Sequence, residues 1–328
     1  MTTSQPPPST VKVAAPFASL PKRVAVAAVA IPAILWLAML GEYPFFALIV
    51  VLSSLALHEF YRLAERKGAF PLKTVGLVAG LAVNAACIYE RLQLDVFQFF
   101  ADRGIHLSMF SQYQFLSVIL LVFVLLVALL ELFRTKGSSL MNLGSTVAGV
   151  LCISLCFGTL VLMRELFPYG FPVHRFFSVS MASDDQLAQV NRWGGMTVIA
   201  IFASIWMCDT AAYFGGLLLG RHKLFERVSP GKTWEGAAFG FLFAVATLVL
   251  AQQVVLPYLR LSQAIVIGSF VGVFGQLGDL IESRFKRDAG VKDSSALIPG
   301  HGGVYDRFDS LVFVAPIVYL YIDFVVLS

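Results

Sequence analysis

The chain has 328 residues, of which 58% are hydrophobic and 13% are charged, and its formal net charge is +4. Soluble domains carry about 25% charged residues, so this composition excludes an ordinary soluble or secreted domain, which could not bury so much apolar surface. The composition indicates an integral membrane protein, for which we expect no nucleic-acid partner.

Residues 1–20 begin with MTTSQPPPST, and this run of prolines and small polar residues predicts a disordered tail rather than a signal peptide. The remainder, 21–328, is predicted to form one polytopic membrane domain. A spanning helix needs about 20 mostly apolar residues. Such segments occur near 23–41, 44–62, 72–89, 113–133, 143–163, 195–217, 236–256, 262–282 and 310–327. The sequence therefore predicts an all-α protein with about nine transmembrane helices.

Basic residues gather on one side of these predicted spans. With the N-terminus in the cytoplasm and the chain alternating, 18 of the 24 lysine and arginine residues fall in cytoplasmic segments and six fall on the opposite side. Cytoplasmic loops carry such an excess, so the pattern supports both the number of spans and a cytoplasmic N-terminus. Two of these loops, 220–235 and 283–309, hold the densest groups of polar residues.

Polar residues also occur late in two of the spans that end at the predicted cytoplasmic side. His58 and Glu59 lie near the end of the second span, where they are either interfacial or support the same cavity as the polar loops. Asp209 lies inside the sixth span, and Tyr213 follows on the same helix face. Ionisable groups within a span normally face a cavity or a partner, so these positions are candidates for function.

The loop at 220–235 contains SPGKT, which is similar to the end of a phosphate-binding P-loop. That motif requires a glycine where this chain has Glu226, and no strand is predicted before it, so a P-loop is excluded. We interpret Ser229 as the N-cap of the seventh span, followed by a proline in the first helical turn. Capping alone does not explain Lys232 and Glu235, which we treat as candidate site residues.

The most polar segment is 276–309, QLGDLIESRFKRDAGVKDSSALIPGHGGVYDRFD. If the eighth helix continues through its start, Asp279, Glu282, Ser283 and Lys286 share one helix face. An acid at the centre of a span costs about 2.5–3.5 kcal/mol on insertion scales, so Asp279 is expected to face a cavity or a partner.

The other end of this segment carries Asp306 and Asp309 at the expected start of the ninth span. One of them could cap the helix, but capping does not account for both together with the preceding HGG. Carboxylates from two helix ends can converge on Mg²⁺, which accepts few protein oxygens and lets substrate phosphates complete its octahedron. The surrounding basic residues suit a polyphosphate, and the glycines let backbone N–H groups approach an anion. His301 is interpreted as a donor to a phosphate or carboxylate.

Residues 283–309 resemble the signature of the phosphatidate cytidylyltransferases, also called CDP-diacylglycerol synthases. The signature is matched by Ser283, Lys286, Arg287, Lys292, Asp293, His301, Gly302, Gly303, Asp306, Arg307 and Asp309. The upstream stretch is similar to the same family at Asp209, Ala212, Tyr213, Gly220, Arg221, Ser229, Pro230, Lys232, Thr233, Glu235 and Gly236. Gly231 departs from the pattern, because many members have a basic residue there, and one phosphate contact is thereby in doubt.

The resemblance implies that CTP and phosphatidate give CDP-diacylglycerol and diphosphate. It implies a metal pair held by Asp279 and Asp306, with Mg²⁺ and a monovalent cation such as K⁺. Lys286 and His301 are the other expected catalytic residues. Fifteen of the other matched residues are expected to bind the substrates: Asp209, Tyr213, Arg221, Ser229, Lys232, Thr233, Glu235, Ser283, Arg287, Lys292, Asp293, Gly302, Gly303, Arg307 and Asp309.

Two other functions stay open at the level of sequence. A CTP-dependent kinase of a membrane alcohol would release CDP rather than diphosphate. A transporter could use Asp209 and Asp279 as ion sites, although no internal repeat is evident. We expect a multi-pass protein of the cytoplasmic membrane, in contact with membrane lipids, and a homodimer is compatible with its apolar faces.

Overall fold

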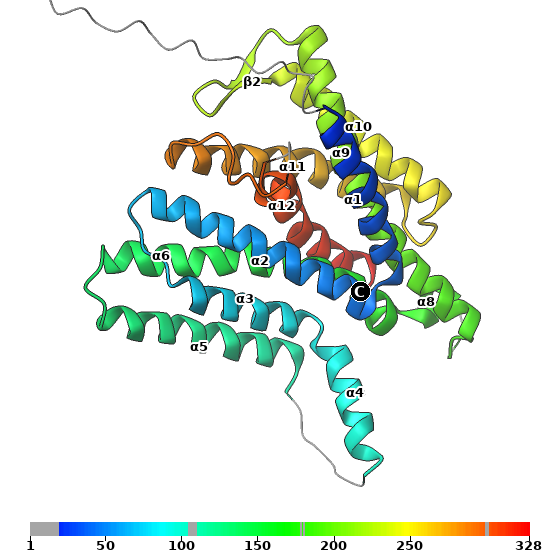
Figure 1. Ribbon diagram of the computed structural model, residues 1–328. Helices are drawn as coiled ribbons and strands as arrows, with labels where there is room; N and C mark the ends of the chain where they lie inside the picture. The colour runs from blue at the N-terminus through cyan, green and yellow to red at the C-terminus, as the bar shows by residue number, and fades with distance from the viewer. Residues whose placement is uncertain (1–19, 104–109, 178, 180, 299–301) are drawn as a thin grey trace, which may run out of the picture.

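The computed structural model describes residues 20–103, 110–177, 179, 181–298 and 302–328. Residues 1–19 of the predicted disordered tail, 1–20, lie outside the described residues. The described residues are mostly helical, with one short two-stranded hairpin (Figure 1). The elements in chain order are α1 Leu20–Leu40, α2 Glu42–Arg66, α3 Lys73–Cys87, α4 Tyr89–Ala101, α5 Gln112–Leu132, α6 Ser139–Gly149, η1 Val150–Leu155, α7 Cys156–Glu165, η2 Leu166–Gly170, α8 Val173–Phe177, α9 Asp184–Leu219, β1 Lys223–Phe225, β2 Ser229–Thr233, α10 Trp234–Val254, α11 Leu261–Asp288, α12 Tyr305–Tyr321 and η3 Ile322–Val326.

The all-α, multi-span prediction is confirmed, but the count of nine is not. Among the described residues, seven helices are long and apolar enough to cross a membrane. An eighth is added if α3 and the start of α4, which meet at a 70° bend, form one broken span. The first predicted span corresponds to a shorter apolar helix, Val24–Leu40.

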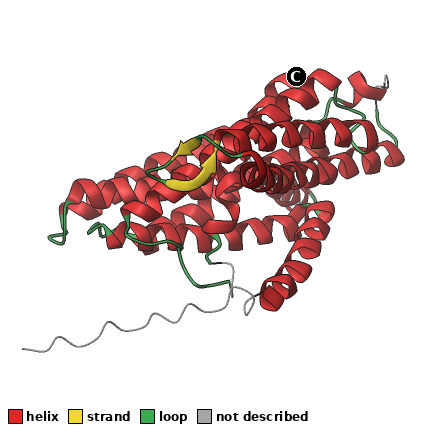
Figure 2. Ribbon diagram, turned by 90° about the horizontal axis from the view of Figure 1, so that it is seen from above, coloured by secondary structure: helices red, strands yellow, loops and turns green. Residues whose placement is uncertain are grey.

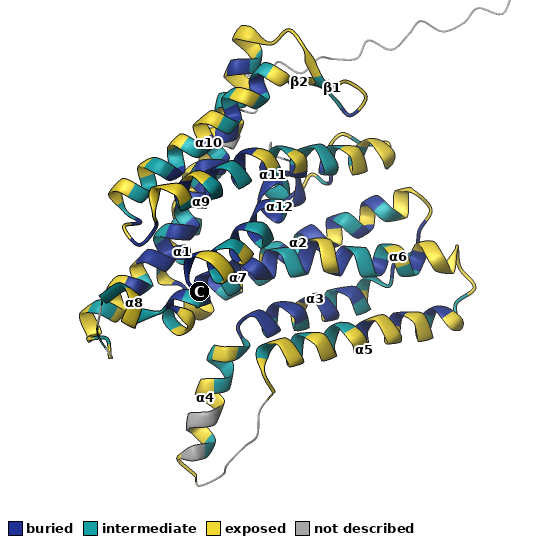
Figure 3. Cartoon of the chain, turned by 180° about the vertical axis from the view of Figure 1, so that it is seen from behind, coloured by how far each residue is buried: buried dark blue, intermediate teal, exposed yellow. Residues whose placement is uncertain are grey.

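The helices pack in a spatial order that differs from their order in the chain. Helices α5, α3 and α2 lie side by side, and α12 and α11 follow on the other side of α2 (Figure 1). Helices α10 and α9 continue this arrangement and contact one another extensively. Seen from behind, α5 is largely exposed, whereas buried residues concentrate around α2, α7, α11 and α12 (Figure 3). The C-terminal helices therefore join the centre of the fold.

Ion pairs at the two ends of the bundle agree with the alternation of the spans. At one end, Lys67, just after α2, pairs with Asp288 at the end of α11 at 3.2 Å. At the other, Arg91 of α4 pairs with Glu42 at 3.2 Å and Glu165 at 3.0 Å. If successive spans cross the membrane in opposite directions, Lys67 and Asp288 fall at one end of the bundle, and Glu42, Arg91 and Glu165 fall at the other. That the Lys67 end faces the cytoplasm stays a prediction.

A two-stranded antiparallel hairpin connects α9 to α10 and projects from the bundle (Figures 1 and 2). Ser229 lies in β2 opposite Phe225, so its predicted role as the N-cap of the following helix is wrong. Thr233 takes that role, and its hydroxyl accepts a 3.1 Å hydrogen bond from Gly236 N. The hairpin delays the helix start by four residues because the chain first turns back to pair β2 with β1.

Candidate active site at the ends of α9 to α12

The polar segment of α11 lies directly against the start of α12. Gly278 makes this approach possible: a Cβ atom there would lie only 2.6 Å from the backbone oxygen of Asp309 and 3.0 Å from the Phe313 ring. With no side chain at Gly278, the two helix backbones come close enough to bring the acids of α11 beside those of α12.

Three carboxylates meet at this contact. Asp279 and Glu282 of α11 and Asp309 of α12 each offer an oxygen atom, and these three atoms lie within 4.8 Å of one another. The Glu282 side chain is fully buried, and neither of its oxygens has a hydrogen-bond partner among the described residues. Like charges at about 4 Å repel by about 4 kcal/mol at an effective dielectric constant of 20. The cluster therefore needs positive charge close by.

Two lysines supply part of that charge. The Lys286 ammonium lies 2.6 Å from Glu282 Oε2, although without hydrogen-bond geometry, and it donates to Asp306 Oδ1 at 2.9 Å. Lys232, from β2, lies 2.5 Å from Asp279 Oδ2. The hairpin that displaces the predicted N-cap thus also brings a cation onto α11.

The charges of this group do not balance when its members are ionised. Asp279, Glu282, Asp306 and Asp309 carry four negative charges, against two positive charges on Lys232 and Lys286. Asp209 and Arg307, which interact electrostatically, add one charge of each sign. Among these described residues an excess of two negative charges remains, which a divalent cation would neutralise. Together with the fully buried carboxylate of Glu282, whose Oε1 has no hydrogen-bond partner among the described residues, this donor set fits Mg²⁺.

Asp306 is held differently from the other acids. Its carboxylate accepts hydrogen bonds from Ser294 N at 3.0 and 3.1 Å and from Gly303 N at 2.7 Å, besides the one from Lys286. Asp306 is therefore linked to the three-carboxylate cluster through Lys286. Sequence reasoning named Asp279 and Asp306 as the metal pair, and the structure adds Glu282 and Asp309 beside Asp279.

Glu59 of α2 is a member of this region whose role the sequence left open. Its side chain is buried, and within the described residues its carboxylate accepts four hydrogen bonds from the loop before α12 and from the first turn of that helix. His58, its neighbour, is exposed. The signal in the sequence was an acid late in an apolar segment, but nothing in the sequence showed which segment it would contact.

The two glycines of the HGG motif serve this packing. Gly302 has φ +86°, a left-handed conformation that favours glycine. A methyl group at Gly303 would overlap Ser294 Oγ and Glu59 Oε2.

Ser283, the first residue of the signature, donates to Asp279 Oδ1 at 3.3 Å.

We expect Gly303→Ala to reduce activity by at least about tenfold and to lower the melting temperature, because overpacking a filled site costs about 1–3 kcal/mol. Gly231→Ala is the matched control, since a methyl group there meets nothing within 4 Å. Thermal unfolding in detergent and the rate of the purified variants measure both effects. Equal behaviour of the two variants would contradict the packing role of Gly303.

The remaining candidates lie around the cluster rather than in it. Glu235 accepts hydrogen bonds from Arg221 N, His222 N and His222 Nδ1, so it fixes the base of the hairpin. The Arg287 guanidinium donates to Val291 O. The candidates with exposed side chains are Asp209, Tyr213, Arg221, Arg287, Lys292, Asp293 and Arg307. His301 lies outside the described residues.

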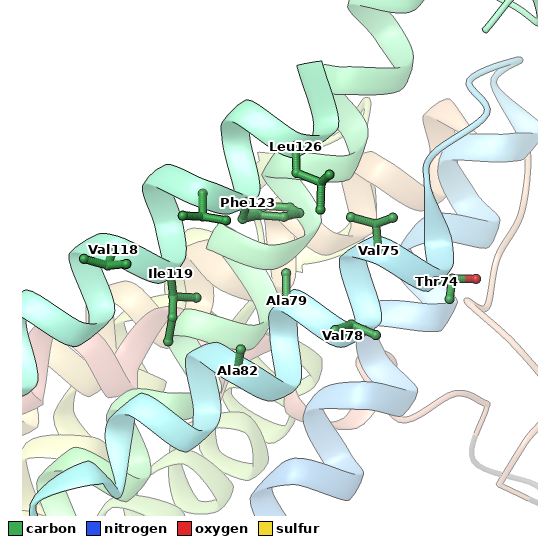
Figure 4. A pocket seen from close by; sticks show the side chains of 10 residues that line it. Thr74, Val75, Val78, Ala79, Ala82, Val118, Ile119, Phe123 and Leu126 are labelled. Atoms are coloured by element: carbon green, nitrogen blue, oxygen red, sulfur yellow. The ribbon is translucent and has the colours of Figure 1, made fainter. Parts of the chain in front are cut away.

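An apolar cavity of about 410 Å³ lies between α3 and α5, apart from this cluster (Figure 4). Its lining consists of aliphatic side chains, Phe123 and Thr74, and it contains no charged group. Such a lining has no group for transferring or binding a phosphate. The carboxylate–lysine cluster is therefore the better candidate for chemistry.

Comparisons with known proteins agree with the resemblance found in the signature. The model of the cytidylyltransferase family matches residues 21–325. A phosphatidate cytidylyltransferase of Bacillus subtilis is 33% identical over 288 residues, which cover 87% of this chain and 91% of that protein. One of Synechocystis is 32% identical over 308 residues, covering 92% and 96%. A third, of Staphylococcus epidermidis, is 43% identical over 120 residues, covering 37% and 46%.

Proposed function

The chain belongs to the cytidylyltransferase family, and on this premise we propose that it converts CTP and phosphatidate into CDP-diacylglycerol and diphosphate. The observation that carries the proposal is the carboxylate–lysine cluster, which is held by α11, α12 and the hairpin at the ends of apolar helices. A water-soluble nucleotide and a lipid phosphate can meet only at such an interface. This answers why so apolar a chain concentrates its acids and bases in one place.

The proposed reaction exchanges one phosphoanhydride bond for another. A phosphate oxygen of phosphatidate forms a bond to the α-phosphorus of CTP, and the bond from that phosphorus to the bridging oxygen of the β-phosphate breaks. Diphosphate leaves with the electron pair. The attacking oxygen is already anionic near neutral pH, so the site needs no strong base, and positioning with charge neutralisation carries the catalysis.

The chain's own cations suit the phosphates of both substrates. Lys286 lies between two acids, so an arriving triphosphate finds its ammonium already desolvated and held in place. Arg287, Lys292 and Arg307 are exposed at the same end of α11 and α12, and we assign them to the nucleotide. Lys232 and Arg221, on the hairpin side, are assigned to the lipid phosphate or CTP.

We further propose that Asp279, Glu282 and Asp309 hold Mg²⁺, with Asp306 as the additional ligand that the resemblance implies. A bound divalent cation would contact phosphate oxygens and neutralise the charge that develops during transfer. A K⁺ ion beside it stays a prediction, which a comparison of rates in potassium and sodium buffers tests.

The cytoplasmic membrane is the proposed location, and a homodimer is the proposed assembly. The long apolar helices and the bacterial relatives support the first. The exposed apolar face of α5 offers area for a second copy or for lipid. Light scattering of the detergent-solubilised protein measures the assembly directly.

The function is tested with purified protein in mixed micelles that contain phosphatidate, Mg²⁺ and CTP labelled in both the cytosine and the γ-phosphate. We expect the cytosine label to enter the lipid and the γ-label to leave as diphosphate, with Asp306→Asn as the inactive control. Entry of the γ-label into a lipid, with release of CDP, would identify a kinase. If neither label moves in folded protein that binds Mg²⁺, the proposal fails and transport becomes the next assay.

A further inference from the structure

Glu59 is a buried acid that contacts the signature loop from a distant part of the chain. It lies on α2 with 3% of its surface exposed. Ser294 Oγ donates to Glu59 Oε2 at 2.9 Å, and Ser295 Oγ donates to Glu59 Oε1 at 2.6 Å. Between 235 and 246 residues separate Glu59 from its donors. One carboxylate on α2 therefore binds two successive serines of the segment between α11 and α12.

The same carboxylate caps α12. Val304 N donates to Glu59 Oε1 at 3.1 Å, and Tyr305 N donates to Glu59 Oε2 at 2.8 Å. The first N–H groups of a helix have no acceptor within the helix. Val304 occupies the N-cap position, and its apolar side chain cannot accept hydrogen bonds from them. A negative charge at this position is also favoured by the helix dipole. Glu59 thus supplies from another helix the cap that α12 lacks.

Glu59 and Asp306 accept hydrogen bonds from the same short segments of the chain. Ser294 is bound by both carboxylates, since its hydroxyl donates to Glu59 and its N–H donates to Asp306. Gly303 N donates to Asp306, and the next two N–H groups donate to Glu59. The position of Asp306, and with it the partner of Lys286, therefore depends on the hydrogen bonds that Glu59 accepts.

We propose that Glu59 is a positioning residue for cytidylyl transfer: it sets the start of α12 and the position of Ser294 and Ser295, and through them the orientation of Asp306 and Lys286. The inference rests on the proposed function for the reaction that is positioned. It does not place Glu59 in contact with either substrate.

The test compares Glu59→Gln with Glu65→Gln. Both residues lie on α2, but Glu65 is exposed and pairs with Lys73 at the surface, where ion pairs contribute little. An amide at position 59 turns one acceptor oxygen into a donor that faces N–H and O–H groups. We expect kcat to fall by about 10–100-fold, the range for supporting groups behind a metal ligand. The KM for CTP should change less, and more Mg²⁺ should be needed for half-maximal rate.

Hydrogen exchange supplies a readout that does not depend on turnover. We expect Glu59→Gln to speed amide exchange in peptides that cover 294–310, with no change in those peptides for Glu65→Gln. Normal kcat, Mg²⁺ dependence and exchange in Glu59→Gln would overturn the proposal. If wild-type protein transfers no cytidylyl group, the proposed function has failed, and the exchange measurement still decides whether Glu59 orders the loop.

A second variant serves if Glu59→Gln does not fold. Ser294→Ala combined with Ser295→Ala removes the two hydroxyl donors but leaves the carboxylate and the backbone cap in place. We expect a several-fold lower kcat and a higher Mg²⁺ requirement in a protein that unfolds near the wild-type temperature. Unchanged kinetics in this double variant would also overturn the proposal.

Discussion

Replacing Asp279 with asparagine is expected to lower the rate of cytidylyl transfer by about 10²–10³-fold, the usual effect of removing one preorganised electrostatic group from an active site. Asp279 joins Glu282 and Asp309 in the carboxylate cluster and pairs with Lys232 at 2.5 Å. Losing its charge removes a metal ligand in our proposal and leaves Lys232 without its partner. The rate as a function of Mg²⁺ concentration, and Mn²⁺ binding by paramagnetic resonance, measure the two consequences separately.

Asp288→Asn is the matched control, because Asp288 lies on the same helix but is exposed and pairs with Lys67 at the surface. The pair of variants Asp306→Asn and Asp309→Asn then separates the ligand set implied by the resemblance from the set that the cluster indicates. The variant that weakens Mn²⁺ binding identifies the ligand. Full activity of Asp279→Asn with unchanged Mg²⁺ dependence would refute a metal site at this cluster.

Lys286→Met is expected to abolish measurable transfer and to destabilise the protein by about 3–5 kcal/mol, the range for removing one partner of a buried ion pair. The side chains of Lys286, Glu282 and Asp306 are 12%, 0% and 2% exposed. Without the ammonium, the buried acids Glu282 and Asp306 lose the cation that lies 2.6 and 2.9 Å from their oxygens. Thermal unfolding in detergent measures the loss.

Lys67→Met provides the control, since the Lys67–Asp288 pair is half-exposed on both sides. The double variant Lys286→Met with Glu282→Gln distinguishes electrostatics from lost packing. Removing the acid together with the base should recover much of the stability and none of the activity. If the double variant is as unstable as Lys286→Met alone, the destabilisation comes from packing around the methylene chain.

Hydropathy predicted where the helices lie but not how each crosses the membrane. All nine predicted segments are helical, because a backbone within a bilayer must satisfy its own hydrogen bonds and long apolar runs do so as helices. The 70° bend between α3 and α4 falls at Ile88, where the sequence has neither proline nor glycine. That bend follows from tertiary contacts, which a hydropathy pattern does not contain.

The sequence predicted the contacts between site residues that are close in the chain, but not those between residues that are far apart. Asp279 and Glu282 share a helix face by spacing alone, and Lys286 follows Glu282 by one turn. The ion pair between Lys232 and Asp279 depends on a hairpin that the SPGKT pattern did not predict. The contact of Glu59 with Ser294 depends on α2 packing beside α12, which apolar helices of similar hydropathy cannot specify in sequence.

The cap on α12 links the enzyme's activity to the timing of its synthesis. Ser294 follows Glu59 by 235 residues. Ribosomes add about 5–20 residues per second, so about 12–47 s pass between the two. During that interval α2 carries an acid whose hydrogen-bond donors on Ser294, Ser295, Val304 and Tyr305 have not been synthesised. The contacts that Glu59 makes with the start of α12 can therefore form only after Val304 and Tyr305 have been synthesised.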